Sequence, residues 1–263
     1  MFGSFIGTTN DAGTDWGEQM LNTVASQSIR HLFSQSESID LEIHCHPSSK
    51  LLQGNLDGIK MTGTGLVIRR DFPVERMSFE TDMVAIDFGS ILSGTLRLKQ
   101  PTQAMARVEL SESGINRAFG AKLVTRRLEN LDWPQLMEIS GGKPVSFGDV
   151  QVKLLPQNRI EIFAKAQVGD ESIPICANTQ ITIERRRRVL FEDAQFKDEN
   201  VPEPLQDKSR SLGKAFIAAL NEMVDLDRFD LDGVMMRLNR LETQGKNLIF
   251  SGYARIDRVP KNP

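Results

Sequence analysis

The chain has 263 residues, 40% of them hydrophobic and 25% charged, which is enough to bury a substantial core in one large domain or two small ones. Its 32 basic and 35 acidic residues nearly cancel, so the net charge of −3 argues against a nucleic-acid partner. Cys45 and Cys176 are too few for a disulfide framework, and we expect two reduced thiols.

The amino-terminal segment, residues 1–36, is expected to contain an amphipathic helix. Asp15 and Glu18 have the spacing of a capping box at its start. This helix packs on the protein's own core, or it lies at a membrane interface or over an apolar cavity as a lid. The apolar residues near helical spacing are Trp16, Met20, Val24, Ile29 and Leu32 or Phe33.

A strand with one wet face is predicted after Ser38, where apolar and polar residues alternate. His44 and His46 share the wet face, whereas Cys45 points the other way with Ile39, Leu41 and Ile43. With His31 as the only other histidine, we predict no metal site.

Closely paired antiparallel strands are expected next, because short apolar runs are separated by Gly54, Gly58, Gly63 and Gly65. A short helix over residues 47–53 precedes them, and a strand over 74–87 leads into a second short helix or turn over 88–94. This region contains four short motifs: Leu51-Leu-Gln-Gly-Asn-Leu-Asp-Gly58, Gly63-Thr-Gly-Leu-Val67, Ala85-Ile-Asp-Phe-Gly89 and Gln100-Pro-Thr102.

In these motifs the sequence resembles the LmeA-like family of bacterial phospholipid-binding proteins, over about residues 38–258. The motifs are glycine turns and apolar strands, so they identify a fold more than a chemistry. The family is similar to tubular lipid-binding proteins, in which a curved antiparallel sheet wraps helices and leaves an apolar tunnel. The resemblance therefore implies a lipid ligand.

In the middle of the chain, alternation predicts a half-buried strand whose inward residues are Ala104, Ala106, Val108 and Leu110. A helix over residues 111–128, capped by Ser111, is predicted to follow it. Residues 134–144 are interpreted as a loop. Three long strands follow, and strands of such length must twist and coil. They cover residues 150–154, 160–168 and 173–183.

The basic run Arg185–Arg188 at the end of these strands is either a solvated strand end or a rim that holds phosphate. A charged connection over residues 200–208 precedes an amphipathic helix over 211–224. The tail supplies strand residues Val234 to Leu241 and then Leu248, Phe250, Gly252, Ala254 and Ile256, and the last strand is expected to close the sheet.

Enzyme chemistry is not predicted. Gly141-Gly-Lys143 leads to Pro144 and not to a helix, so it is no phosphate-binding loop, and no serine has the flanking glycines of a nucleophile elbow. We therefore expect no catalytic residue, no cofactor and no metal.

Together these observations predict an α+β fold, with one long curled antiparallel sheet wrapped around amphipathic helices, in a single lipid-binding domain over residues 37–260. Methionine and aliphatic side chains suit flexible acyl chains, but composition alone favours the packed core of a large α+β domain. The resemblance implies that the protein binds phospholipid or another long-chain lipid without catalysis, in an apolar cavity or groove, for lipid transfer or for envelope or membrane maintenance. The lining is expected from the inward stripes of the helices and helical turns: Leu51, Leu52, Ile91, Leu92, Ile115, Phe119, Leu123, Phe216, Leu220 and Met223.

The alternative is a structural or scaffold protein of a membrane-associated assembly, which would show an exposed apolar patch in place of a cavity. With no signal peptide and no apolar run of the roughly 18 residues that cross a bilayer, we expect a cytoplasmic location with peripheral membrane contact. Trp16, Met20 and Phe33 would enter the lipid interface, and the head-group partners would be Arg126, Arg127 and Arg185 to Arg188.

Overall fold

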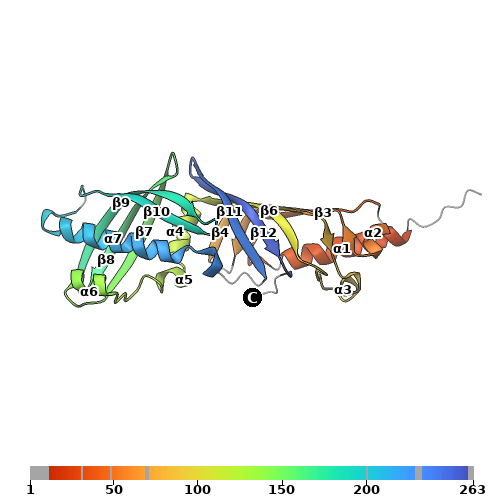
Figure 1. The fold of residues 1–263 in the computed structure, drawn as a ribbon, viewed down its shortest axis with the longest axis horizontal. Helices are drawn as coiled ribbons and strands as arrows, with labels where there is room; N and C mark the ends of the chain where they lie inside the picture. The colour runs from red at the N-terminus through yellow and green to blue at the C-terminus, as the bar shows by residue number, and fades with distance from the viewer. Residues whose placement is uncertain are drawn as a thin grey trace, which may run out of the picture.

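The computed structural model is an α+β fold in which every paired strand is antiparallel (Figure 1). Hydrogen bonding divides the strands into a six-stranded sheet, a four-stranded sheet and a small two-stranded sheet. The structure describes residues 12–30, 32–47, 49–68, 71–199, 201–228 and 233–259.

The six-stranded sheet has the order β1-β3-β4-β6-β12-β11 and the four-stranded sheet the order β10-β9-β8-β7. The first comprises β1 (Ser38–His44), β3 (Gly58–Ile68), β4 (Phe72–Thr81), β6 (Thr102–Ser111), β12 (Asn247–Ile256) and β11 (Val234–Gln244). The second comprises β7 (Val145–Leu155), β8 (Arg159–Val168), β9 (Glu171–Glu184) and β10 (Arg188–Phe196), and the small sheet pairs β2 (Asn55–Leu56) with β5 (Val84–Ala85). The helices are α1 (Ala12–Arg30), α2 (Ser49–Leu52), α3 (Phe88–Leu92), α4 (Glu112–Phe119), α5 (Lys122–Thr125), α6 (Pro134–Ser140) and α7 (Gln206–Met223), with 3-10 turns η1 (Glu203–Leu205) and η2 (Leu226–Arg228).

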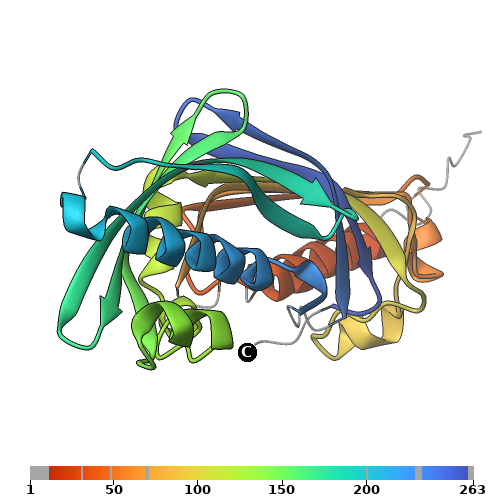
Figure 2. The ribbon, with the colours of Figure 1, turned by 60° about the vertical axis from the view of Figure 1, so that its left-hand side comes forward.

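Helix α7 runs along one face of the four-stranded sheet and buries its apolar stripe there (Figure 2). Phe216 is 1% exposed, and its ring centroid lies 4.9 Å from that of Phe147. Gly213 allows the close approach, since a Cβ there would stand 2.4 Å from the ring of Phe196. We call this cluster the α7 core; it also takes in Leu238, Leu241 and Leu248 of the six-stranded sheet.

Helix α1 forms a second core with α2, α3 and one corner of the six-stranded sheet. Leu21, Val24 and Ala25 supply the helix side, because residues spaced three and four apart share a face. Leu51 and Ile91 are fully buried against them. We call this cluster the α1 core.

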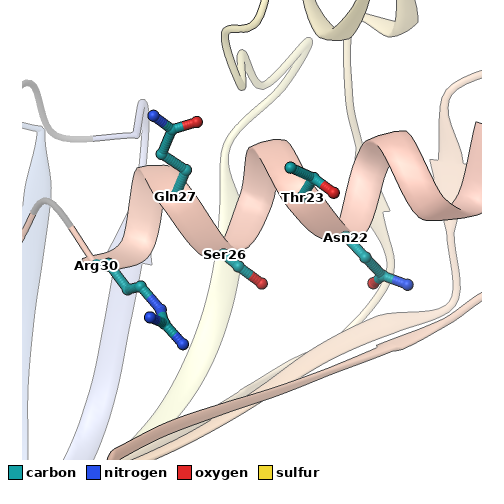
Figure 3. A pocket seen from close by; sticks show the side chains of 5 residues that line it. All are labelled: Asn22, Thr23, Ser26, Gln27 and Arg30. Atoms are coloured by element: carbon teal, nitrogen blue, oxygen red, sulfur yellow. The ribbon is translucent and has the colours of Figure 1, made fainter.

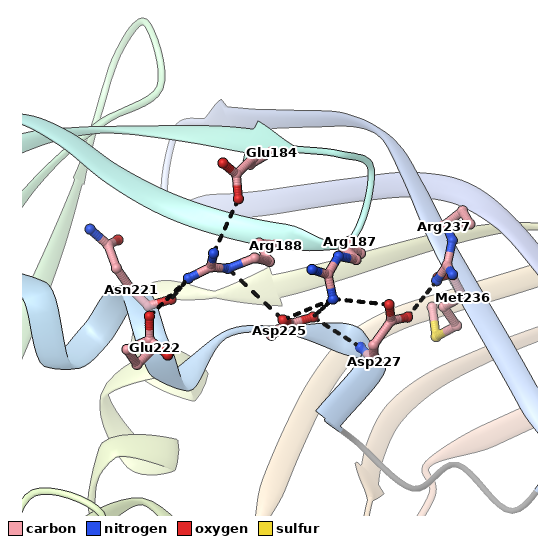
Figure 4. A network of polar contacts seen from close by, with 9 residues as sticks. All are labelled: Glu184, Arg187, Arg188, Asn221, Glu222, Asp225, Asp227, Met236 and Arg237. Atoms are coloured by element: carbon pink, nitrogen blue, oxygen red, sulfur yellow. Dashed lines mark hydrogen bonds and ion pairs between the residues drawn. The ribbon is translucent and has the colours of Figure 1, made fainter.

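A buried carboxylate ties the two large sheets together where α7 ends (Figure 4). Asp225 is 5% exposed, and both of its carboxylate oxygens accept from Arg187 Nη1, Oδ1 at 3.3 Å and Oδ2 at 3.1 Å. Arg187 also donates to Asp227 at 3.0 Å, and Asp227 in turn accepts from Arg237 of β11 at 2.7 Å. The chain of contacts therefore runs from the β9–β10 turn to the edge of the six-stranded sheet.

Several predicted elements are confirmed, including α3, α7 and the strands in which apolar and polar residues alternate. Ser111 caps α4 as expected, accepting from the Gly114 N–H at 3.2 Å. The helix predicted over residues 111–128 is wrong beyond Phe119, because the chain breaks at Gly120 and resumes as α5. Asp15 does not cap α1, which already begins at Ala12.

Three further corrections concern the sheets and one loop. The sequence predicted one extended sheet, but the strands form separate sheets, and β12 lies inside its sheet, between β6 and β11, instead of closing it. The predicted loop over residues 134–144 contains α6, with Pro134 at its first turn and Gly141 left-handed at its end (φ 67°). The run Arg185–Arg188 is a hairpin turn into β10, a strand the sequence analysis missed.

Candidate functional site

One face of the six-stranded sheet is apolar from edge to edge. In an antiparallel ladder directly paired residues point to the same face, so the register defines rows that cross all six strands. One row is Leu41, Met61, Phe79, Ala106, Gly252 and Leu238, and the next is Ile39, Gly63, Met77, Val108, Phe250 and Leu241. We call this surface, together with Ala104, Ala254 and Met236, the apolar face.

The other face of the same sheet is polar. Its rows interleave charged and hydroxyl side chains, among them Lys60, Ser78, Glu80, Arg107 and Ser251. This face also carries two exposed apolar side chains, Met105 and Tyr253, with the guanidinium of Arg186 at 6.0 Å from the Tyr253 ring. The sheet is thus clearly two-sided.

The two helix cores cover only the ends of the apolar face. The α1 core takes Leu41, Ile43, Ile59 and Phe79, whereas the α7 core takes Leu238, Leu241, Leu248 and Phe250. The remaining residues belong to neither core, and most are only half-buried. These half-buried residues are Ile39, Met77, Ala106, Val108, Met236, Gly252 and Ile256.

Small side chains occupy the middle of the apolar face, at Ala104, Ala106, Gly252 and Ala254. Only glycine fits at position 252, because strand β11 bulges between Leu238 and Arg240. A Cβ at Gly252 would lie 2.0 Å from the Arg237 carbonyl oxygen. Ala104 and Ala254 are nevertheless covered, at 1% and 7% exposed, and only Ala106 and Gly252 of this strip are half-buried.

A hollow of about 590 Å³ follows the side of α1 that points away from the α1 core (Figure 3). Its lining side chains are amides, hydroxyls and one guanidinium, although carbon atoms contribute most of its surface. The lining residues are Asn22, Thr23, Ser26, Gln27 and Arg30.

The pKa shifts of Asp57, Asp227 and Cys176 arise from hydrogen bonds or from burial. The pKa of Asp57 is lowered by a hydrogen bond from Lys50 at 2.8 Å and a second from the His46 N–H at 2.6 Å. The pKa of Asp227 is lowered chiefly by the hydrogen bond from Arg237, and burial raises the pKa of the Cys176 thiol. Over the ranges that the structure describes, no three His, Cys, Asp or Glu side chains gather as metal ligands.

The lining residues predicted from the helices do not meet in one space. Five of them lie in or against the α7 core, namely Ile115, Phe119, Phe216, Leu220 and Met223, and two in the α1 core, Leu51 and Ile91. Three point outward instead of inward, with exposed fractions of 58% for Leu52, 56% for Leu92 and 43% for Leu123. In α2 and α3, one aliphatic residue (Leu51 or Ile91) turns in and the leucine after it turns out, because a single turn has only one inner side.

Of the arginines predicted as head-group partners, Arg127, Arg187 and Arg188 contact the carboxyl end of α7 or the turn after it, whereas Arg186 contacts Asn239 and the Tyr253 ring. Arg127 donates to the Met223 carbonyl at 3.5 Å, and Arg188 to the Asn221 carbonyl at 3.0 Å. Cations at this end stabilise the last carbonyls of a helix. Of the residues predicted at the membrane interface, Met20 packs against the α1 core and Phe33 is half-buried, while the side chain of Trp16 lies outside the described residues.

The fold and this site define an antiparallel α+β protein that presents a long apolar sheet face, covered at both ends by helices. Over the described residues, no helix is long and apolar enough to cross a membrane. No curated protein matches the chain. The chain belongs to the LmeA-like phospholipid-binding family, whose model matches residues 12–252. This membership supports lipid binding and favours a non-enzymatic role.

Proposed function

We propose that the protein binds phospholipid, or another long-chain lipid, non-covalently, with the acyl chains lying on the apolar face between the α1 core and the α7 core. The observation that carries the proposal is the half-buried middle of this face in a chain of a phospholipid-binding family. The proposal includes the curled sheet that the resemblance implies, with helices on its inner side. Of the helix residues predicted as lining, the seven in the two cores would lie at either end of the acyl chains, whereas Leu52, Leu92 and Leu123 point outward and would not take part.

The dimensions of the face suit long acyl chains. Six strands spaced about 4.8 Å apart span about 24 Å from the first to the last, and the two helix cores cover part of that span. Each methylene that leaves water contributes about 0.8 kcal/mol, so affinity should rise with chain length until the face is covered. The face is incompletely covered, which suits a carrier that accepts and releases lipid at a membrane surface, and we extend the proposal to lipid transfer through peripheral membrane contact.

The first test is native mass spectrometry of the purified protein, followed by titration with a fluorescent acyl lipid. Val108→Asp places a carboxylate in the middle of the apolar face, beside Met77 and Phe250. Burying that charge under an acyl chain costs at least about 2.8 kcal/mol, so affinity should fall about 100-fold. Met105→Asp is the matched control, since Met105 lies on the same strand, faces the polar side and is 63% exposed.

Equal lipid affinity of the Val108→Asp and Met105→Asp variants would remove the apolar face from the proposal. Absence of any bound or titratable acyl lipid from the parent protein would instead favour the scaffold alternative. Thermal unfolding of each variant shows whether the fold is retained. Transfer is measured separately, as movement of labelled lipid between donor and acceptor liposomes.

A further inference from the structure

Both edges of the four-stranded sheet are closed by asparagine side chains. On β7, Asn116 accepts from the Val152 N–H at 2.7 Å and donates to the Val152 carbonyl at 3.0 Å. On β10, Asn221 accepts from the Phe191 N–H at 2.7 Å and donates to the Phe191 carbonyl at 3.3 Å. A carboxamide offers the same donor and acceptor pair as a neighbouring strand, so each edge is occupied.

The β11 edge of the six-stranded sheet is closed in the same way. Asn158, in the β7–β8 turn, accepts from the Thr243 N–H at 2.9 Å and donates to the Leu241 carbonyl at 3.1 Å. Further along β11, the Leu238 N–H donates to the Arg186 carbonyl at 2.6 Å. Three of the four edges of the two large sheets are therefore protected against further strand pairing.

The fourth edge, β1, has no such closure from the described residues. Among the strands that the structure describes, β1 pairs with β3 alone, and an edge strand turns the N–H and C=O groups of alternate residues away from its neighbour. The side chains of β1 alternate between exposed and half-buried along its whole length. Among the described residues, the outer main-chain groups of β1 therefore have no strand partner, although helix α1 packs beside β1 on its apolar side.

The side chains of β1 determine which residues would suit a strand paired with it. Asp40 and Glu42 are exposed on the polar face. Glu42 has two distant basic partners, Lys60 at 3.7 Å and His44 Nε2 at 3.9 Å, while Asp40 has no ion pair within the described ranges. Ile39 and Leu41 extend the apolar face to the edge and remain half-buried. Cross-strand neighbours of opposite charge, and apolar neighbours on the other face, stabilise an antiparallel pair.

We propose that β1 is a docking edge for an extended segment of another protein in which basic and apolar residues alternate. The basic residues would face Asp40 and Glu42, and the apolar residues would cover Ile39 and Leu41. A second copy of β1 fits poorly, because two-fold pairing centred on Asp40, Leu41 or Glu42 brings acidic residues opposite one another. The mode is strand addition, in which main-chain hydrogen bonds give affinity and side chains give specificity.

The probe is a capped peptide of alternating lysine and valine, matched in length to β1 and titrated by calorimetry. Two control peptides have the same composition: one groups the lysines in a block, and one keeps the order but carries N-methyl groups on alternate amides. The alternating peptide should bind the unmodified protein at least about tenfold more tightly than either control, because only it combines the charge order with free edge hydrogen bonds.

The charge reversal Asp40→Lys with Glu42→Lys should weaken the alternating peptide by about tenfold or more, since two attractive cross-strand pairs become repulsive. Asp170→Lys is the matched control, an exposed acid in the β8–β9 turn, and should change affinity by less than about twofold. The reversed variant is checked for folding by circular dichroism.

Equal binding of the blocked or N-methylated peptide to the unmodified protein would overturn the proposal, and this arm needs no variant that might fail to fold. Equal weakening by Asp170→Lys would also overturn it, since the attraction would then be general. Concentration-dependent dimerisation abolished by the charge reversal would assign the edge to a second copy of this chain and not to a basic partner.

Discussion

Removing Arg187 should destabilise the protein, because the buried carboxylate of Asp225 loses its main cationic partner. Arg187→Met keeps much of the aliphatic stem but deletes both hydrogen bonds to Asp225, whose side chain is 7% exposed. Breaking a fully buried pair costs about 3–5 kcal/mol. Here the guanidinium is 29% exposed, and Asp225 keeps the Asp227 N–H at 3.1 Å and Arg188 at 3.9 Å. We therefore expect a loss of about 2–3 kcal/mol in the free energy of unfolding.

That loss corresponds to a fall of about 4–12 °C in the thermal midpoint for a chain of this size. Urea titration and scanning calorimetry measure it. Arg237→Met is the matched control, because it removes an arginine from the same network, but Arg237 and its partner Asp227 are 34% and 39% exposed. Its effect should be no more than about a third of the effect of Arg187→Met. Equal losses in the two variants would refute the argument from burial.

Three other outcomes follow from the same structure. Phe216→Ala should cost about 3–5 kcal/mol in urea unfolding, because it empties the centre of the α7 core, and a cost below that of the half-buried Phe250→Ala would contradict this placement. Cys176 should resist iodoacetamide in the folded protein and react in denaturant, as read by mass spectrometry, because it is buried and its thiol pKa is raised; fast native alkylation would be inconsistent with both. The Lys50 hydrogen bond lowers the folded-state pKa of Asp57, so its stabilisation is complete above the ordinary aspartate value of about 3.9 and is lost as the pH falls through the lowered value. The difference in the free energy of unfolding between the parent protein and Lys50→Met should therefore become smaller as the pH falls into the acid range. A difference that becomes larger there would reverse the assigned sign.

Local pattern was sufficient for many elements. Alternation around Leu41, Ala106 and Ile162 predicted strands, and the stripe that includes Phe216 predicted α7, because these signals depend on residues close in sequence. The error at α6 had a local signal as well: Pro134 suits a first helical turn and Gly141 a left-handed end, but both were read as loop residues. The break at Gly120 shortened the predicted helix to α4.

For the candidate site, the sequence by itself determined which side of β1, β6 and β12 is apolar, because their inward residues were identified by alternation, but it assigned no side to β3 or β4. It did not determine that these sides form one face. The pairing of β12 with β6 joins Phe250 to Val108, and the pairing of β4 with β6 joins Met77 to the same residue. Helical periodicity likewise found buried stripes but not that α1 and α7 build separate cores. Only the tertiary structure decides such matters, because register and helix placement depend on contacts between distant segments, which no local period encodes.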